Sequence, residues 1–277
     1  MALAAKNLGS ESREAALRRY YETLYAAYGP QHWWPAQSRF EVIVGAYLTQ
    51  NTAWTNVERA LQRLRSAGVL SLQEIRKIRR SRLERLIRPA GYFRQKAQRL
   101  KAFVAFVDRH YAGSLTRMFG QSTSEIRRQL LALHGVGPET ADSILLYAGD
   151  HPVFVVDAYA RRMLARHNVL PENADYEEVR ELFQRSLAGM PASTMRWAKN
   201  ASMRPAHAPS PVSRRKRSSR VQVYNEAHGL IVAIGKSYCL KKSPRCELCP
   251  LRQFLPPLPE PARTKAQHGV KLLMSRI

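Results

Sequence analysis

The amino-acid sequence predicts an all-α protein built from short helices with globular packing. From Ser10 to Gly149, apolar residues return every three or four positions, and no run with a period of two is convincing. The 277 residues, 45% hydrophobic and 24% charged, allow about two domains and argue against wholesale disorder. No apolar run approaches the ~18 residues of a membrane-spanning helix.

The helices before Gly149 can be predicted one after another from their apolar stripes and their ends. The first two stripes consist of Phe40, Ile43, Val44, Tyr47 and Leu48, and then of Val57, Leu61 and Leu64. Two later helices are expected to begin after Ser71 and Ser122, because a glutamate follows each serine at the capping-box spacing. Helices are expected to end at Gly68, Gly91 and Gly149.

The charge balance is the strongest compositional signal. The chain has 45 Lys and Arg against 21 Asp and Glu, a formal net charge of +24 and an isoelectric point near 10.6. This excess predicts a polyanionic partner, most commonly nucleic acid, with an anionic membrane surface as the rival. The N-terminus lacks a basic segment followed by an apolar one, so we expect no secretory signal and a cytoplasmic protein.

The composition changes between Lys199 and Arg220. Three prolines precede the basic run Ser213–Arg217, and the stretch has no acidic residue and few large apolar ones. We expect this basic insertion, residues 199–220, to be a mobile loop, either solvated and without a role of its own or acting as a clamp on DNA. A helical pattern resumes from Val221 to Ser237, and a proline-rich segment after Cys249 leads into a tail expected to be unstructured.

The most informative stretch begins with a glycine turn. Gly135, Val136 and Gly137 join one predicted helix to the next, which opens at Pro138. Free backbone N–H groups at such a helix start form an anion site that can hold a DNA phosphate without reading sequence. An apolar helix and a valine-rich segment follow, and Asp157 stands 18 positions after Glu139.

These features resemble the endonuclease III superfamily of helix-hairpin-helix DNA glycosylases, whose signature is a glycine-rich hairpin followed at this spacing by an aspartate in a V-D-x-x-x-x-R context. Residues Val156–Arg162 fit that context. Leu48–Thr52, Gly91–Ala97 and the cysteines near the end of the chain extend the resemblance from about Ser38 to Cys249. Within the superfamily, the chain resembles the 3-methyladenine branch most.

The resemblance implies two helical lobes that flank a DNA-binding cleft. It implies an N-terminal helix (1–38) that packs with the C-terminal lobe, and a six-helix lobe (39–149) that carries the hairpin. The C-terminal lobe (150–255) then contains the basic insertion and a cysteine loop (239–255), and a tail (256–277) follows.

Asp157 is the residue for which the resemblance implies the catalytic role. When a glycosidic bond breaks, the sugar becomes cationic, and a carboxylate beside C1′ stabilises that cation and orients water. The alternative role is a helix N-cap, and both can hold. Relatives that also cut the strand carry a lysine in the hairpin helix, whereas this chain has Glu139 there. Since a carboxylate cannot form the imine, we expect a monofunctional hydrolase with weak or absent AP-lyase activity.

The resemblance also implies which residues open the duplex and receive the base. Gln50 lies in the turn where the family places a polar residue that enters the emptied stack; alternatively, Gln50 and Asn51 cap the helix at Trp54. Trp33, Trp34 and Trp54 resemble the aromatic pocket of the 3-methyladenine branch, where electron-rich rings attract a cationic alkylated purine. The alternative for these tryptophans is a role as core anchors.

Cys239, Cys246 and Cys249 have the spacing of the first three ligands of the family's [4Fe-4S] motif, but Leu255 stands where the fourth cysteine is expected. The open iron could take water, hydroxide or another side chain, the site could hold three irons, or the cluster could be lost. A zinc site completed by a histidine is a further alternative, for which His228 is the nearest upstream candidate.

Between the first two cysteines, Lys241, Lys242 and Arg245 are expected to face DNA phosphate, as the resemblance implies for this loop. The expected reaction is hydrolysis of the N-glycosidic bond of a damaged base, most of all an alkylated purine, in double-stranded DNA. The protein is expected to be a monomer associated with the nucleoid through DNA. The alternatives are a glycosylase and AP lyase or mismatch glycosylase acting on damaged pyrimidines, and a DNA-binding module without catalysis.

Overall fold

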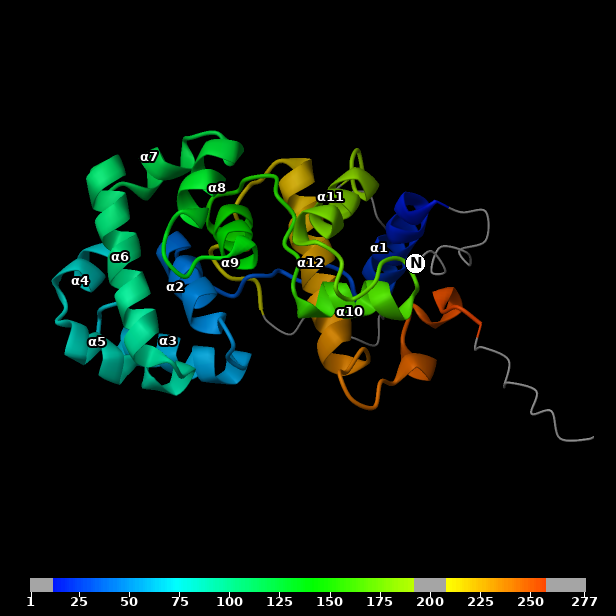
Figure 1. The fold of residues 1–277 in the computed structure, drawn as a ribbon, viewed down its shortest axis with the longest axis horizontal. Helices are drawn as coiled ribbons and strands as arrows, with labels where there is room; N and C mark the ends of the chain where they lie inside the picture. Colours follow the sequence, from blue (N-terminus) through cyan, green and yellow to red (C-terminus); the bar gives the residue numbers. More distant parts are fainter. Residues whose placement is uncertain (1–11, 192–207, 258–277) are drawn as a thin grey trace, which may run out of the picture.

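The computed structural model describes residues 12–191 and 208–257. Within these residues all regular structure is helical and there is no strand, which confirms the all-α prediction (Figure 1). Their α-helices are α1 (Arg13–Tyr28), α2 (Arg39–Thr49), α3 (Trp54–Ser66), α4 (Leu72–Lys77), α5 (Arg80–Leu86), α6 (Phe93–Tyr111), α7 (Leu115–Phe119), α8 (Thr123–Leu131), α9 (Pro138–Ser143), α10 (Ala158–Arg166), α11 (Tyr176–Ser186) and α12 (Ser219–Ser237). A π-helical turn, Ile144–Ala148, directly follows α9.

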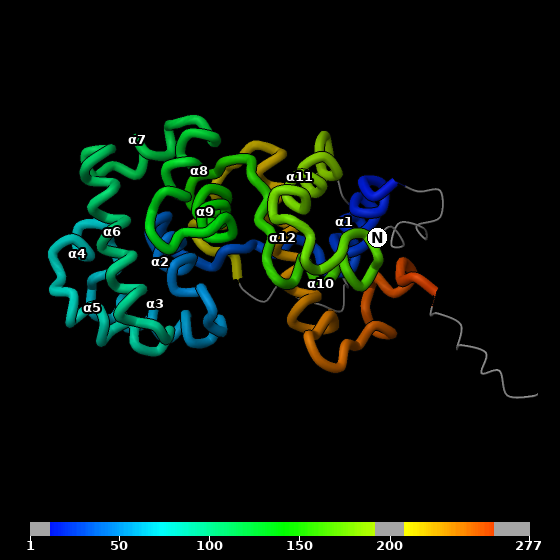
Figure 2. The backbone as a smooth tube through the Cα atoms, viewed as in Figure 1, coloured from blue at the N-terminus to red at the C-terminus, as the bar shows by residue number. Residues whose placement is uncertain are grey.

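The helices form two groups that lie side by side (Figures 1 and 2). We call α2–α9 the hairpin lobe, and we call α1 together with α10, α11 and α12 the cysteine lobe. In the cysteine lobe, α1 packs against α11 and α12, and α10 packs against α12. The two lobes meet at the π-helical turn Ile144–Ala148, which contacts both α2 and α12. This meeting place positions the residues considered below.

The expectation of six helices between residues 39 and 149 is wrong, because this stretch contains the eight helices α2–α9. One additional division falls in the stretch after the predicted helix start at Ser71, whereas the start at Ser122 is as predicted. The backbone is extended at Ile78 and Arg79, which separates α4 from α5. The Ser122 hydroxyl accepts a hydrogen bond from the Glu125 N–H at 3.3 Å and so starts α8 as a helix separate from α7.

A buried lysine of α6 holds the turn between α2 and α3 in the hairpin lobe. Lys96 of α6 is buried there, and its ammonium group donates hydrogen bonds to the carbonyl oxygens of Leu48 and Ala90 and to the Thr52 hydroxyl, at 2.6 to 2.9 Å. Burial and the nearby charge of Arg99 lower the pKa of Lys96 to about 8. These bonds tie the turn between α2 and α3, which carries Gln50, to the body of the lobe.

The basic insertion is packed against the protein in its described part, 208–220, so the expectation of a mobile loop is wrong there; residues 199–207 lie outside the described residues. Val212 is buried, and the Arg217 side chain is only 1% exposed. The physical reason is the carboxylate of Asp150, which forms ion pairs with three arginines, namely Arg39, Arg215 and Arg217. This one carboxylate offsets part of the charge of the insertion inside the protein, whereas Arg214, Lys216 and Arg220 are exposed. Among the described helices, none is both long and apolar enough to cross a membrane.

Candidate active site

Asp157 stands at the N-terminus of α10, directly after the segment that crosses from the hairpin lobe. Its Oδ1 accepts a hydrogen bond from the Ala160 N–H at 2.8 Å, so Asp157 is the N-cap of α10. Its Oδ2 lies 3.4 Å from Nε2 of His228, and the side chain is 12% exposed. The cap occupies one carboxylate oxygen and leaves the other facing the place where the lobes meet, so capping and an active-site role are compatible.

The surroundings of Asp157 keep its carboxyl group ionised. Burial by itself would raise the pKa of Asp157, but His228 and the backbone N–H groups of Ala160 and Tyr159 outweigh this effect, and the pKa is lowered from its ordinary value. A nearly buried carboxylate that is ionised at neutral pH is suited to stabilising a positive charge that develops beside it.

The sequence suggests His228 only as a zinc ligand, and that interpretation is wrong because His228 lies beside Asp157. Its Nδ1 is hydrogen-bonded to the Tyr147 hydroxyl, while its Nε2 faces Asp157. Nine residues of α12 follow His228 before the helix ends at Ser237 and extend over about 14 Å, so His228 is remote from Cys239. Tyr147 lies in the π-helical turn where the lobes meet, and His228 lies in α12, so this pair stands at the meeting place beside the carboxylate. The one feature of the sequence that could have drawn attention to His228 is its place in a largely apolar helical segment.

Glu139 lies in the first turn of α9, at the position where strand-cutting relatives have lysine. Its side chain is open to solvent. Desolvation by the surrounding protein is nevertheless the larger cause that raises the pKa of Glu139 to about 7, and the nearby negative charge of Asp157 adds to it. The shift indicates that the two carboxyl groups lie in one electrostatic environment, in which the charged form of Glu139 is disfavoured.

The glycine hairpin has the backbone conformation that the sequence predicts. Gly135 has φ of 76°, and a Cβ atom at this position would lie 2.1 Å from Nε of Arg99, so both the conformation and the space require glycine. Val136 is buried, and Gly137 is the N-cap residue that precedes α9. The turn is therefore closely packed on the α6 side.

Gln50 is held between the hairpin and α6. Its Nε2 donates hydrogen bonds to the Gly135 carbonyl oxygen at 2.9 Å and to Thr140 Oγ1 at 3.0 Å, and its Oε1 accepts one from Arg99 at 2.6 Å. The alternative that Gln50 caps α3 is wrong, because the N-cap of α3 is Ala53 and no side chain bonds to that end. Gln50 is thus joined to the hairpin, adjacent to the first turn of α9.

The structure brings Trp33, Trp34 and Trp54 together, with ring centroids 5.3 to 5.4 Å apart. Trp34 is 4% exposed, and a Cβ atom on Gly45 would lie 3.0 Å from its ring, so Trp34 packs directly on the backbone of α2. Trp33 is also buried. Trp54 is partly exposed, and its Nε1 donates to Glu58 at 2.7 Å. Trp33 and Trp34 are therefore part of the core, and Trp54 is the least buried of the three.

Residues 44–188 match the family model described as HhH-GPD superfamily base excision DNA repair protein. The chain belongs to this superfamily. A Methanocaldococcus jannaschii protein assigned as a DNA repair glycosylase is 39% identical over 246 residues, which are 88% of this chain and 97% of that protein. Endonuclease III-like protein 1 of Bos taurus is 26% identical over 225 residues, which are 80% of this chain and 60% of that protein.

Solved structures of the superfamily have the same fold. The crystal structure of the Helicobacter pylori 3-methyladenine DNA glycosylase bound to 1,N6-ethenoadenine is similar, with a TM-score of 0.62 and 28% identity over 82% of this chain and 98% of that one. A non-covalent endonuclease III–DNA complex has a TM-score of 0.59 over 79% of this chain and 84% of that one; at 20% identity it shows the fold alone. This HhH-GPD protein is thus a base excision repair DNA glycosylase.

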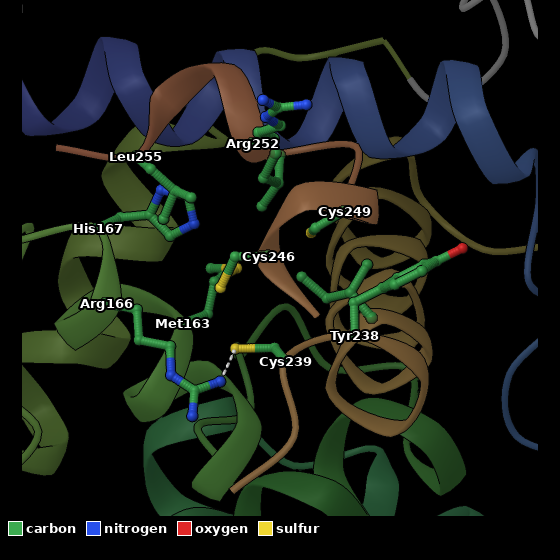
Figure 3. A pocket seen from close by; sticks show the side chains of 11 residues that line it. Met163, Arg166, His167, Tyr238, Cys239, Cys246, Cys249, Arg252 and Leu255 are labelled. Carbon is green, nitrogen blue, oxygen red and sulfur yellow. Dashed lines mark hydrogen bonds between the residues drawn. The ribbon is translucent and has the colours of Figure 1, made fainter. Parts of the chain in front are cut away.

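The three cysteines of this HhH-GPD protein line one small pocket that is partly open to solvent (Figure 3). Cys239 is buried at the end of α12, and Cys246 and Cys249 come from the loop that follows. No three His, Cys, Asp or Glu side chains in the described ranges are arranged to hold a single metal ion. This arrangement disagrees with a zinc site, whose ligands all lie 2.0 to 2.3 Å from one ion.

The loop between Cys239 and Cys246 carries its basic residues on the surface. Lys241, Lys242 and Arg245 are all exposed. The Arg245 N–H donates to the Tyr238 carbonyl oxygen at 2.9 Å, which closes the loop on itself. These three cations are available to a polyanion, in contrast to the paired arginines of the basic insertion.

Proposed function

We propose that this glycosylase is a monofunctional hydrolase that acts as a monomer on double-stranded DNA and releases alkylated purines. One observation carries the proposal: a carboxylate kept ionised at the meeting of the lobes, Asp157, is accompanied by Glu139 at the position where strand-cutting relatives have lysine. The carboxylate is suited to the cation that forms when the base leaves. Without an amine, the chain has no group at this position to capture the sugar covalently.

The reaction begins when the damaged nucleotide leaves the stack, which costs a few kcal/mol. Gln50, held against the hairpin, is positioned to fill the gap. The bond between C1′ and the base nitrogen then breaks, and its electron pair neutralises the positive charge of the alkylated purine. The Asp157 carboxylate stabilises the resulting sugar cation until a water oxygen bonds to C1′ and the water proton passes to solvent. His228 keeps the carboxylate ionised and fixed in orientation.

The choice of an alkylated purine is supported by the aromatic cluster beside this carboxylate. Trp34 contacts Tyr147, with ring centroids 5.3 Å apart, and Tyr147 bonds to His228, so the cluster continues to Asp157. Trp54 offers a partly exposed indole face, which attracts a cationic base by cation–π interaction. An enzyme described as a 3-methyladenine DNA glycosylase, in complex with 1,N6-ethenoadenine, is 28% identical to this chain.

Cys239, Cys246 and Cys249 would hold an iron–sulfur cluster, in keeping with the endonuclease III-like relatives and the cavity that these thiols share. When bound, such a cluster supplies structural cross-linking between the end of α12 and the following loop and takes no part in glycosidic chemistry. The loop then presents Lys241 and its basic neighbours to DNA phosphate.

The proposal is tested by base release from duplexes that each contain one lesion. We expect release of 3-methyladenine and 7-methylguanine and little release of thymine glycol or uracil. The variant Trp54→Ala should lower alkylpurine release while the folded state stays stable. Trp34→Ala, the matched core variant, should instead destabilise the protein by about 3–5 kcal/mol. Preference for thymine glycol or for uracil would overturn the substrate assignment, and no release from any duplex would favour a non-catalytic DNA-binding module.

The monofunctional mechanism has a separate test at Glu139. Borohydride reduces an imine between protein and abasic DNA to a stable covalent bond, so trapped protein reports the lyase reaction. We expect no trapping by the wild-type protein or by Glu139→Gln, and trapping by Glu139→Lys, which restores the amine. Trapping by the wild type would overturn the assignment as a monofunctional enzyme and leave the substrate assignment to the lesion panel.

A further inference from the structure

A histidine from a distant part of the sequence lines the cysteine cavity. His167, which directly follows α10, borders the same cavity as Cys239, Cys246 and Cys249 (Figure 3). It is separated from Cys239 by 72 positions along the chain, so no ligand-spacing rule connects the two. The packing of α10 against α12 is what brings this histidine to the thiols.

The imidazole of His167 is fixed in the manner of a metal ligand. Its Nδ1 lies 3.1 Å from the carbonyl oxygen of Phe254. A carbonyl oxygen only accepts, so Nδ1 carries the proton in this bond and Nε2 keeps its lone pair. Tyr20 of α1 packs on the same ring, with centroids 5.0 Å apart. Metal-binding histidines commonly donate their other N–H to a backbone carbonyl, which fixes both tautomer and orientation.

The bond to Phe254 anchors the imidazole next to the position of the missing cysteine. Leu255 is the following residue, stands at the family's fourth ligand position and borders the same cavity. Of the other polar or sulfur-containing side chains around the cavity, Met163 has a weakly binding thioether, and Arg166 and Arg252 are permanent cations that cannot coordinate a metal. The Tyr238 hydroxyl points away from the three thiols (Figure 3). Among the residues that border the cavity, His167 is therefore the best available fourth donor.

We propose that Nε2 of His167 is the fourth ligand of an iron–sulfur cluster whose other ligands are Cys239, Cys246 and Cys249. The proposal rests on the cluster proposed above and is independent of which base is excised. Assembly forms three Fe–S bonds and one Fe–N bond, and each thiol releases its proton to solvent. Arg166 donates a hydrogen bond to Sγ of Cys239 at 3.1 Å, which favours the thiolate form.

The deciding measurement is spectroscopic and uses the full-length wild-type protein, purified without oxygen. We expect about four irons per chain and absorbance near 400 nm. Pulsed electron paramagnetic resonance of the reduced cluster should show coupling to a directly bound nitrogen, and that coupling should change when the protein is labelled with 15N-histidine. A wild-type cluster without nitrogen coupling would overturn the proposal, as would one bound zinc or no bound metal.

Three variants test whether His167 is the residue that supplies the fourth ligand. His167→Ala should lose one iron and show a three-iron signal, while His110→Ala, which removes an exposed histidine of α6, should leave the cluster unchanged. In the His167→Ala background, Leu255→Cys should restore four irons without nitrogen coupling. Retention of four irons and of the wild-type spectrum by His167→Ala would overturn the assignment. Circular dichroism identifies any variant that does not fold, in which case the wild-type nitrogen coupling alone decides.

Base release is measured on the same preparations, so the two proposals fail separately. A wild-type protein with nitrogen-coupled iron but no base release would contradict the proposed glycosylase substrate and support His167 as a ligand. Base release by a protein free of iron would support the proposed reaction and overturn the ligand assignment.

Discussion

The two ends of α10 carry two different sites. At its N-terminus, Asp157 caps the helix and faces His228. At its C-terminus, Arg166 and His167 border the cysteine cavity. The helix has nine residues, so about 13 Å separates the two ends. Helix α12 completes both sites, because it supplies His228 to the first and ends just before Cys239.

The two ends of α10 differ in how close in sequence the residues at each end are. The carboxylate end is encoded locally, since the hairpin and Asp157 follow one another at a fixed spacing in the sequence. At the thiol end the local motif is broken at Leu255, and the candidate replacement, His167, comes from another segment. The helix dipole suits both ends, because it favours a carboxylate at the N-terminus and a cation such as Arg166 at the C-terminus. A missing motif residue is therefore a weak argument against a site until the fold has been examined.

The largest expected effect is that of Asp157→Asn, which tests whether the ends are independent. An asparagine oxygen can still accept the bond from the Ala160 N–H, so the cap and the stability should be kept. Base release should fall by at least about 10²–10³-fold, because the negative charge beside the sugar is lost. Single-turnover assays on an alkylated duplex measure the rate, and the iron content serves as the control. Retained turnover would show that Asp157 is not the catalytic carboxylate.

The second effect is that of Cys246→Ser at the other end of α10. Loss of the cluster should release the loop that carries Lys241, Lys242 and Arg245. DNA affinity should then fall and depend less on salt, with the slope of log K against log salt reduced by roughly 0.9 for each lost phosphate contact. Base release at saturating DNA should change little. A large loss of single-turnover rate with unchanged affinity would show that the two ends of α10 are coupled.

The sequence predicted the local features of both sites and missed the tertiary ones. Caps, the glycine turn and the helices follow from short-range rules, so Ser122 and Gly135 were read correctly. The contacts of His228 with Asp157 and of His167 with Phe254 could not be predicted, because they form only when distant segments of the chain pack together. The basic insertion was misjudged for a related reason. Its charge suggested solvent, whereas Asp150, far away in sequence, neutralises Arg217 in the folded protein.

A third and smaller effect concerns the partner of the carboxylate. His228→Gln removes a group that lowers the pKa of Asp157, so burial should then raise that pKa. Because the reaction needs the ionised carboxylate, the variant should lose activity most at acidic pH and approach the wild type at alkaline pH. The pH dependence of the single-turnover rate measures this shift. A uniform loss at every pH would assign His228 a purely structural role.

The smallest expected effect is a change in melting temperature caused by Glu139→Gln, beside Asp157 near the N-terminal end of α10. The pKa of Glu139 is raised to about 7 in the folded protein, so folding favours the protonated form, and Glu139 costs stability as the pH rises through about 7. Glu139→Gln mimics the protonated form. It should therefore raise the melting temperature at pH 8, where the wild-type side chain is ionised, and change it little at pH 5. Thermal unfolding followed by circular dichroism measures both values.

The matched control for this prediction is Glu172→Gln, which changes an exposed glutamate away from Asp157 and should have the same small effect at both pH values. The stabilisation at pH 8 should become smaller when Glu139→Gln is made in the Asp157→Asn background, because the repelling charge is then absent while the desolvation of Glu139 remains. If the gain persists undiminished in that background, desolvation of Glu139 by the surrounding protein and not the charge of Asp157 accounts for it. The two carboxyl groups would then lie in one cleft without acting on each other.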